Sequence, residues 1–193
     1  HDTPRHRTRY GGSEARARVA ATVLLTLRGT PFLYAGEELG LCDAEVPEER
    51  RVDPGGRDGC RAPIPWEEGV LHGWASDPWL PWPPGVATGD AGSLAWDGSS
   101  ILHLYRRLLA ARRRSPALHA GSWRPLDAPA GVLAYERLAD DGDRRRVWAN
   151  FGDEDAACPA GWVVEVSTTG RDEGSAWDGR LGGTEAVVVR PGG

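Results

Sequence analysis

Two short polar clusters hold the residues of this sequence that could do chemistry. His1 and Asp2 stand side by side at its start, and Arg57, Asp58 and Arg61 follow one another closely further on. Arginine and carboxylate side chains form strong, directional hydrogen bonds that suit sugar hydroxyl groups. The flat apolar faces of the nearby tryptophans suit the C–H faces of sugar rings. These residue types favour a carbohydrate site, although a lone His-Asp pair is more often a structural unit.

A second pair of carboxylates, Glu37 and Glu38, follows the apolar run at residues 31–35. The run is bounded by Gly-Thr-Pro and by glycines, so we expect a buried strand that opens into a polar loop. In an α/β protein, the carboxyl end of such a strand faces the side where active sites lie. The simpler interpretation is that Glu38 only pairs with an arginine of a neighbouring loop.

The elements around this strand follow from hydrophobic spacing. Apolar residues recur every three or four positions over residues 14–28, with Ser13 as a helix cap and Gly29 at the end, which predicts an amphipathic helix. A second helix is predicted over residues 99–114, where Pro116 stops it. Helix, strand and loop in this order are typical of one α/β repeat, which cannot bury its strand alone.

Residues 41–98 form a long segment without periodicity, and five of the nine tryptophans lie in it. A loop of this length in a compact protein usually has a function. We therefore expect an active-site loop, with the alternative that most of the tryptophans only anchor it.

After Gly121 the pattern changes to short apolar runs separated by turn residues, which predicts a small antiparallel β domain. The stretch Asp140-Asp141-Gly142-Asp143 predicts a hairpin turn. The domain boundary is expected near residue 118, which gives domains 1–118 and 119–193. The predicted strands cover residues 122–126, 132–138, 145–151, 162–167 and 186–189.

Composition excludes several classes of partner. The net charge is -5, which argues against nucleic acid and anionic membranes, and no apolar run is long enough to span a bilayer. Three cysteines are too few for a disulfide framework; Cys42 and Cys60 could meet, but reduced thiols in a cytoplasmic protein are the preferred expectation. The five histidines show no metal-ligand spacing, so neither a metal nor a cofactor is expected. Because the sequence contains no Met, we expect it to be the C-terminal part of a longer protein.

Four motifs in order give a resemblance to a known family: HDTPRH, RGTPFLYAGEELG, GRDGCRAPIPW and SILHLYRRLLAARRRSPAL. Together they resemble the C-terminal part of the α-amylase superfamily, glycoside hydrolase family 13, and its α-glucosidase and oligo-glucosidase branch in particular. The resemblance implies an α/β plus all-β fold. The helix at 14–28 and the strand at 31–35 would close a (β/α)8 barrel, the helix at 99–114 would be its last helix, and a small antiparallel β-sandwich would follow.

The resemblance also implies residue roles. Asp2 matches the third carboxylate of these retaining glycosidases, which holds sugar hydroxyls and stabilises the transition state, and His1 matches its hydroxyl-binding neighbour. Arg61 matches a loop arginine that approaches the same sugar, whereas Arg57 and Arg5 are weaker candidates. The Ala and Ile of RAPIPW replace the usual Thr and Met, which leaves the shape of the subsites open.

The family's nucleophilic Asp and general-acid Glu would precede His1, and neither Glu37 nor Glu38 matches them. The resemblance therefore implies a parent α-glucosidase acting on α-glucoside oligosaccharides, and a chain that is inactive by itself. Three alternatives stay open. They are a transglycosylase or isomerase acting on sucrose or maltose, a non-catalytic partner protein, and a carbohydrate-binding module formed by the tail.

Overall fold

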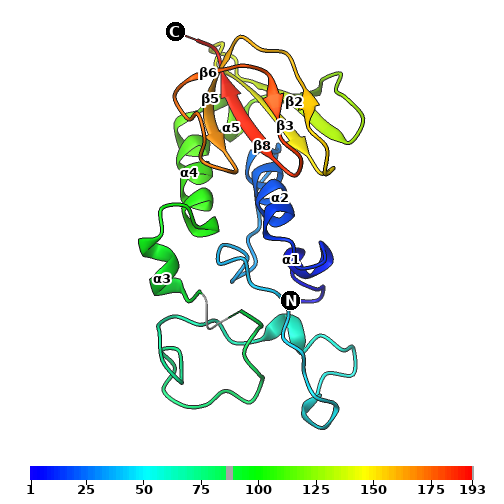
Figure 1. Ribbon diagram of the computed structural model, residues 1–193, viewed down its shortest axis with the longest axis vertical. Coiled ribbons are helices and arrows are strands. Elements are labelled where there is room, and N and C mark those ends of the chain that lie inside the picture. The colour runs from blue at the N-terminus through cyan, green and yellow to red at the C-terminus, as the bar shows by residue number, and fades with distance from the viewer. Residues whose placement is uncertain (86–88, 193) are drawn as a thin grey trace. The chain divides into compact units, whose positions relative to one another are not determined.

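The computed structural model describes residues 1–85 and 89–192, and they form two compact units (Figure 1). Unit 1 contains His1–Ala17 and Phe32–His103, and unit 2 contains Arg18–Pro31 and Leu104–Gly193. The helices α2 and α4 each begin in unit 1 and end in unit 2. The domain boundary predicted near residue 118 separates a barrel from a β domain in the longer protein, and it stays a prediction. Residues 86–88 of the predicted loop lie outside the described residues.

Unit 1 consists mainly of loops joined by short helices. The Trp-rich segment contains two turns of 3-10 helix and the short helix α3, which Asp90 caps by accepting a hydrogen bond from the N–H of Ser93. The elements of this unit are α1 (His6–Arg9), the start of α2 (Glu14–Thr26), η1 (Glu48–Arg50), η2 (Gly59–Arg61), α3 (Ala91–Trp96) and the start of α4 (Ile101–Arg114).

The buried strand expected at residues 31–35 is not observed. None of these residues belongs to a strand, and the side chains of Phe32 and Leu33 are 84% and 42% exposed. A strand needs neighbours that pair its backbone and cover its faces, and the described residues before Ser122 contain no other strand. The apolar pattern at residues 31–35 is therefore not sufficient by itself to form a strand.

Unit 2 contains the ends of both long helices. The helices predicted over 14–28 and 99–114 are confirmed as α2 and α4, each shortened by two residues at one end. Pro116 opens a further helix, α5 (Pro116–Ala120), which the sequence analysis missed. Ser115 caps α5 by accepting a hydrogen bond from the N–H of Leu118.

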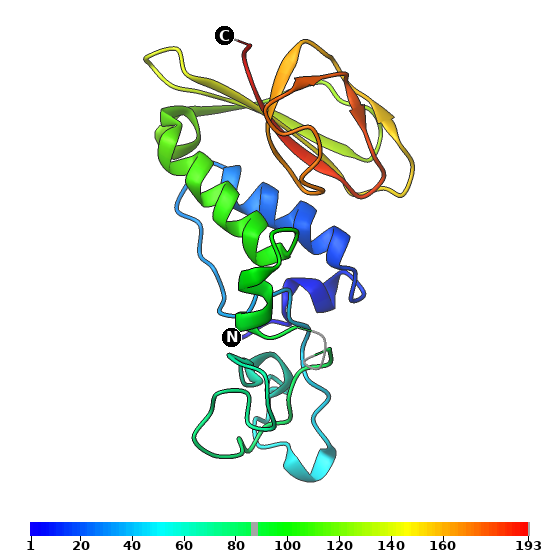
Figure 2. The same cartoon turned by 60° about the vertical axis from the view of Figure 1, so that its left-hand side comes forward.

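The predicted antiparallel β domain is confirmed as a six-stranded sheet in the order β1-β2-β3-β8-β5-β6, next to a two-stranded ribbon of β4 and β7 (Figure 2). The predicted hairpin joins β2 to β3, where Leu138 pairs with Arg144. The strands are β1 (Ser122–Pro125), β2 (Val132–Leu138), β3 (Arg144–Asn150), β4 (Ala156–Ala157), β5 (Trp162–Ser167), β6 (Ala176–Trp177), β7 (Arg180–Leu181) and β8 (Ala186–Arg190).

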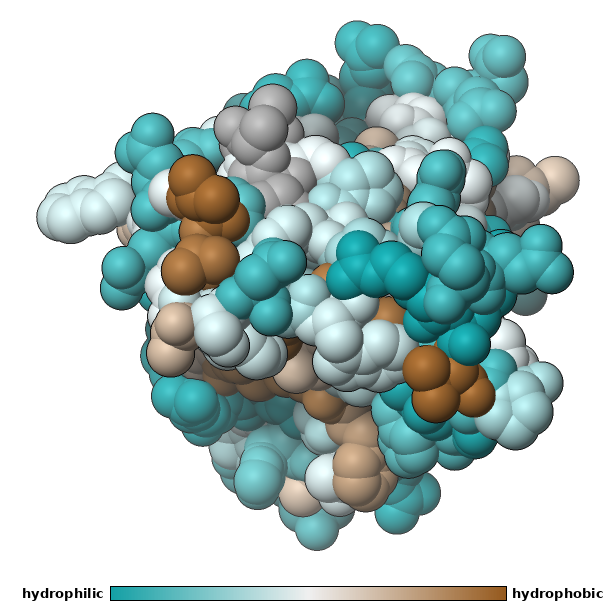
Figure 3. Space-filling model, turned by 90° about the horizontal axis from the view of Figure 1, so that it is seen from below, coloured by the Kyte–Doolittle hydropathy of each residue, from teal (hydrophilic) through white to brown (hydrophobic). Residues whose placement is uncertain are grey.

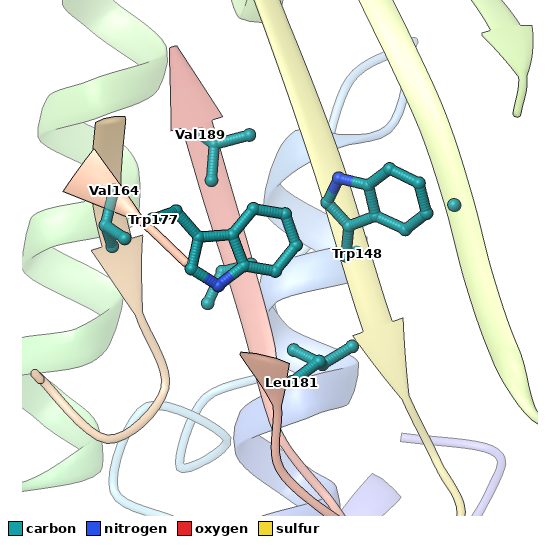
Figure 4. Close-up of a cluster of buried hydrophobic side chains, with 7 residues drawn as sticks. Trp148, Val164, Trp177, Leu181 and Val189 are labelled. Atoms are coloured by element: carbon teal, nitrogen blue, oxygen red, sulfur yellow. The ribbon is translucent and has the colours of Figure 1, made fainter. Parts of the chain in front are cut away.

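One core cluster of unit 2 lies on one face of the large sheet. Trp148 of β3 and Trp177 of β6 approach each other with ring centroids 6.0 Å apart, and Leu181 of β7 packs beside them (Figure 4). A smaller cluster joins Val19 of α2 to Ala149 and further residues of the sheet. The end of α2 is therefore part of the same folded unit as the sheet.

Candidate active site

Asp2 is held by three groups that all approach the same carboxylate oxygen. The Nη1 atom of Arg57 donates a hydrogen bond of 2.8 Å to Oδ1, and Nε2 of His1 lies 3.2 Å from this oxygen. The Nη2 atom of Arg61 lies 3.5 Å from it. Within the part of the chain that the structure describes, Oδ2 of Asp2 makes no hydrogen bond, and the side chain is 58% exposed. One oxygen is thus fixed, and the other is open to a ligand.

Arg57 is positioned by Asp53, four residues earlier. Asp53 accepts hydrogen bonds from Nε of Arg57 at 2.9 Å and from its Nη2 at 2.6 Å, and also from its backbone N–H at 2.9 Å. Asp58 closes the same turn by accepting hydrogen bonds from the backbone N–H groups of Val52 and Asp53. This bidentate geometry leaves Nη1 of Arg57 directed at Asp2.

The charges of this cluster are stable over a wide pH range. Hydrogen bonds from the side chain and backbone of Arg57 hold the pKa of Asp53 far below its ordinary value. Hydrogen bonds to Asp53 and then to Asp2 raise the pKa of Arg57. Arg57 therefore remains cationic and Asp53 anionic throughout the physiological range.

The loop is also joined to the first residue of the chain. Arg61 donates a hydrogen bond from Nε to the carbonyl oxygen of His1 at 3.1 Å, and the buried thiol of Cys60 lies 3.4 Å from the same oxygen. The hydroxyl of Tyr34 donates to the carbonyl of Cys60 at 2.8 Å. Residues 59 and 60 positions apart are thereby brought together.

A cavity of about 860 Å³ opens beside this cluster and lies wholly within unit 1. Asp2, Arg57 and Asp58 line it, together with the facing loop at residues 43–47. This volume is within the range of small-molecule sites and is ample for a sugar ring. The exposed oxygen of Asp2 and the arginine forks supply polar groups that can bind sugar hydroxyls.

Arg5, a weaker candidate, lies apart from this cluster. Its side chain is only 2% exposed. Its Nη1 donates to the carbonyl oxygen of Ala35 at 2.5 Å, and its guanidinium lies 4.9 Å from the ring centroid of Tyr34. Gly36 leaves the space that this guanidinium occupies, because a Cβ there would lie 2.4 Å from Nη1. In this structure Arg5 holds the chain around residues 34–36 and does not approach Asp2.

Glu37 and Glu38 stabilise their own turn. Oε2 of Glu38 accepts a hydrogen bond of 2.9 Å from the backbone N–H of Gly36, and Oε1 of Glu37 lies 3.3 Å from Nδ1 of His6. Among the described residues, Glu38 forms no ion pair with an arginine, which was the simpler interpretation of its role. Both carboxylates therefore have local structural partners.

The tryptophans of the long loop divide into two groups. Trp82 packs against His72 and Trp74, with ring centroids 4.5 Å and 6.4 Å away, and Nε1 of Trp74 donates a hydrogen bond to the carbonyl oxygen of Ile64. These side chains anchor the loop to itself. Others are exposed, above all Trp96 at 93%. On the face shown in Figure 3, the apolar side chains are separate and surrounded by hydrophilic residues.

Cys42, Cys60 and Cys158 are all free thiols. Among residues 1–85 and 89–192, no three His, Cys, Asp or Glu side chains lie close enough to hold a metal ion. No helix of the described chain has the length and apolar character to span a membrane.

Sequence reasoning missed Asp53, which organises the cluster. Asp53-Pro54-Gly55-Gly56 is a turn sequence, and a carboxylate four residues before an arginine was the signal that could have revealed it.

Comparisons with known proteins give a consistent picture. The family model "Alpha amylase, catalytic domain" matches residues 1–121. A probable alpha-glucosidase of Rhizobium meliloti is 37% identical over 71% of this chain and 27% of its own length. An oligo-1,6-glucosidase of Halalkalibacterium halodurans is 29% identical over 87% of this chain and 36% of its own length. The chain thus spans about a third of these curated relatives.

Two solved structures resemble almost the whole chain. The trehalulose synthase MutB from Pseudomonas mesoacidophila has a TM-score of 0.84 at 27% identity, and the match covers 97% of this chain and 41% of that one. An alpha-glucosyl transfer enzyme, XgtA, has a TM-score of 0.82 at 36% identity, with 98% of this chain and 39% of that one covered.

Proposed function

Because this chain belongs to the alpha-amylase family, we propose that its parent protein is a retaining α-glucosidase. It would release terminal α-linked glucose from oligosaccharides, which would be its substrate partners. The names of the curated relatives support this class of reaction. The three free thiols support a cytoplasmic location of the parent.

One observation carries the proposal: the carboxylate of Asp2, fixed through Oδ1 and open at Oδ2, lies beside a cavity with His1 and Arg61 next to it. Glycoside cleavage passes through an oxocarbenium-like transition state with positive charge on the sugar. A preorganised carboxylate stabilises that charge more strongly than it stabilises the neutral substrate. Asp2 would therefore bind hydroxyl groups of the sugar and lower the barrier.

The proposed architecture explains the uncovered segment at residues 31–35. In this proposal residues 1–118 form the C-terminal part of a (β/α)8 barrel, with residues 31–35 as its last strand and 41–98 as an active-site loop. Residues 119–193 form a C-terminal β-sandwich. The exposure of Phe32 supports this arrangement, since neighbouring barrel strands would cover it.

The chain alone is proposed to be inactive. A retaining mechanism needs two carboxyl groups about 5–5.5 Å apart across the glycosidic bond. Glu37 and Glu38 match neither the family's nucleophile nor its general acid, and in the structure Glu37 pairs with His6 while Glu38 accepts a hydrogen bond from Gly36. The 193-residue chain should therefore release no nitrophenol from an aryl α-glucoside, whereas the full-length protein should release it readily. Equal activity of the two proteins would refute the proposal.

A second candidate reaction is transfer of the glucosyl group, as in an isomerase or transglycosylase acting on sucrose or maltose. The similarity to a trehalulose synthase and to an alpha-glucosyl transfer enzyme favours it. Chromatography of the products that the full-length protein forms from sucrose and maltose separates the two candidates. Free glucose supports hydrolysis, and new disaccharides support transfer.

A further inference from the structure

Two arginines of unit 2 are buried without a carboxylate partner. Arg137 is fully buried and Arg112 is 8% exposed. Within residues 1–85 and 89–192, neither forms an ion pair with Asp or Glu. Their six hydrogen bonds all go to backbone carbonyls, three from Arg112 to Leu25, Leu27 and Gly29, and three from Arg137 to Thr26, Gly121 and Ser122.

These carbonyls satisfy N–H groups but do not balance the charge. Several of them belong to the C-terminal end of α2, which is equivalent to roughly half a negative charge. Two guanidinium groups therefore leave an excess of about one and a half positive charges, and buried charges are normally paired. Burial lowers the pKa of both arginines, and repulsion from Arg112 lowers that of Arg137 further.

A cavity of about 440 Å³ lies beside Arg112, entirely within unit 2. Its wall carries three basic side chains, those of Arg28, Arg112 and His119, and no carboxylate. The side chains of Arg28 and His119 are exposed, and in the described part of the chain they make no hydrogen bond or ion pair. The cavity thus combines one buried arginine, Arg112, which has no carboxylate partner among the described residues, with two exposed basic side chains that make no polar contact there.

We propose that this cavity binds a small phosphate group, either as the free ion or as a phosphate monoester. A phosphate dianion would compensate the excess positive charge, and its oxygens accept several hydrogen bonds at once. Guanidinium groups match phosphate oxygens in geometry. Arg28 and His119 would donate to it directly, and Arg112 would supply charge from the buried side. This site is independent of Asp2 and of the proposed glycosidase reaction.

The test is a titration of the isotope-labelled chain with inorganic phosphate, followed by NMR at constant ionic strength and near-neutral pH. Backbone amide signals of Gly29, Thr30 and His119 should shift saturably. The double variant Arg28→Ala/His119→Ala should bind about tenfold more weakly or worse, because it loses two direct donors. A second titration with a hexose monophosphate identifies the source of the phosphate group. If the natural ligand is a monoester, the hexose monophosphate should bind more tightly than inorganic phosphate. If it is the free ion, the hexose monophosphate should not bind more tightly.

The control is Arg9→Ala, which removes an exposed arginine at a position that does not line the cavity. It should bind phosphate like the wild type, and circular dichroism should show that this control and the double variant are both folded. Signals that shift linearly without saturation would overturn the proposal. Equal affinity of the wild type and of Arg28→Ala/His119→Ala would overturn it as well.

Discussion

The carboxylate of Asp2 receives its donors on one side only. Oδ1 is the oxygen that Arg57, His1 and Arg61 all approach. The cluster therefore fixes the direction of the carboxylate without occupying both of its oxygens. A free carboxylate would have to be oriented at the moment of substrate binding. Here that orientation exists before the ligand arrives, which is the preorganisation that transition-state stabilisation requires.

The role of Asp53 can be tested in the chain itself. Replacing Asp53 with Asn removes its charge and one of two acceptor oxygens, so the bidentate hold on Arg57 should be lost. We expect the Nε–H proton of Arg57 to exchange faster with water in Asp53→Asn than in the wild type, as measured by NMR of labelled arginine side chains. The midpoint of thermal unfolding should fall as well, because the side chain of Asp53 is only 8% exposed and its lowered pKa means that its charge stabilises the folded state.

Asp155→Asn is the control for this prediction, since Asp155 is 68% exposed and lies 3.7 Å from Arg180, and an Asn side chain can still accept its 3.1 Å hydrogen bond from the N–H of Gly183. It should leave the exchange rate of Arg57 unchanged. If the Nε–H of Arg57 exchanges equally in Asp53→Asn and in the wild type, Asp53 does not position it.

At the scale of elements, the junction between α5 and β1 depends on Gly121. A Cβ at this position would lie 2.6 Å from two backbone oxygens, those of Ala117 and Leu138. Because backbone atoms cannot move aside as a side chain can, Gly121→Ala should lower the free energy of unfolding by about 1–3 kcal/mol. Urea denaturation measures this change. Gly98→Ala, at a glycine with no atom within 4 Å of the added methyl group, should stay within about 0.5 kcal/mol of the wild type.

A loss of stability in Gly98→Ala as large as in Gly121→Ala would contradict the assignment of the effect to the crowded junction, because Gly98 has no atom within 4 Å of the added methyl group.

The helices and strands that could be predicted are those whose sequence pattern lies within the element itself. The spacing of apolar residues gave α2 and α4, and β2 (Val132–Leu138) and β5 (Trp162–Ser167) match the predicted ranges residue for residue. Two-residue strands such as β4 and β7 carry no period of their own, so sequence alone could not reveal them. The segment at 31–35 has a clear strand pattern without a strand, because strand formation depends on neighbours that a local pattern does not contain.

The residues of the candidate site were also only partly predictable from the sequence. His1, Asp2, Arg57 and Arg61 were identified from ordered motifs, and the structure brings them together. Arg5 carried the same kind of signal but is buried against Tyr34, because a motif specifies residue order and not the direction of a side chain.

At the scale of the whole molecule, buried carboxylates make stability depend on pH. Burial by itself would raise the pKa of Glu136, but hydrogen bonds from Arg146 and Arg124 lower it below its ordinary value of 4.5. A lowered pKa in the folded state means that the carboxylate stabilises the protein fully above the unfolded value and loses this contribution as the pH falls through the folded value. The fully buried side chain of Glu136 should show this clearly.

We therefore expect Glu136→Gln to be less stable than the wild type near neutral pH, and we expect the difference to shrink as the pH falls below 4.5. Chemical denaturation of both proteins at a series of pH values measures it. A difference in unfolding free energy that stays constant down to the acid-unfolding limit would mean that the charge of Glu136 contributes nothing.

The most direct test of the account as a whole is the effect of Asp2→Asn on kcat/KM of the full-length enzyme with an aryl α-glucoside. The Asn side chain keeps the shape of Asp2 but cannot offer a negative charge to the transition state, so kcat/KM should fall roughly a hundredfold or more. Asp155→Asn should match the wild type. An Asp2→Asn enzyme that is folded and retains the wild-type kcat/KM would contradict the assignment of Asp2 to the active site.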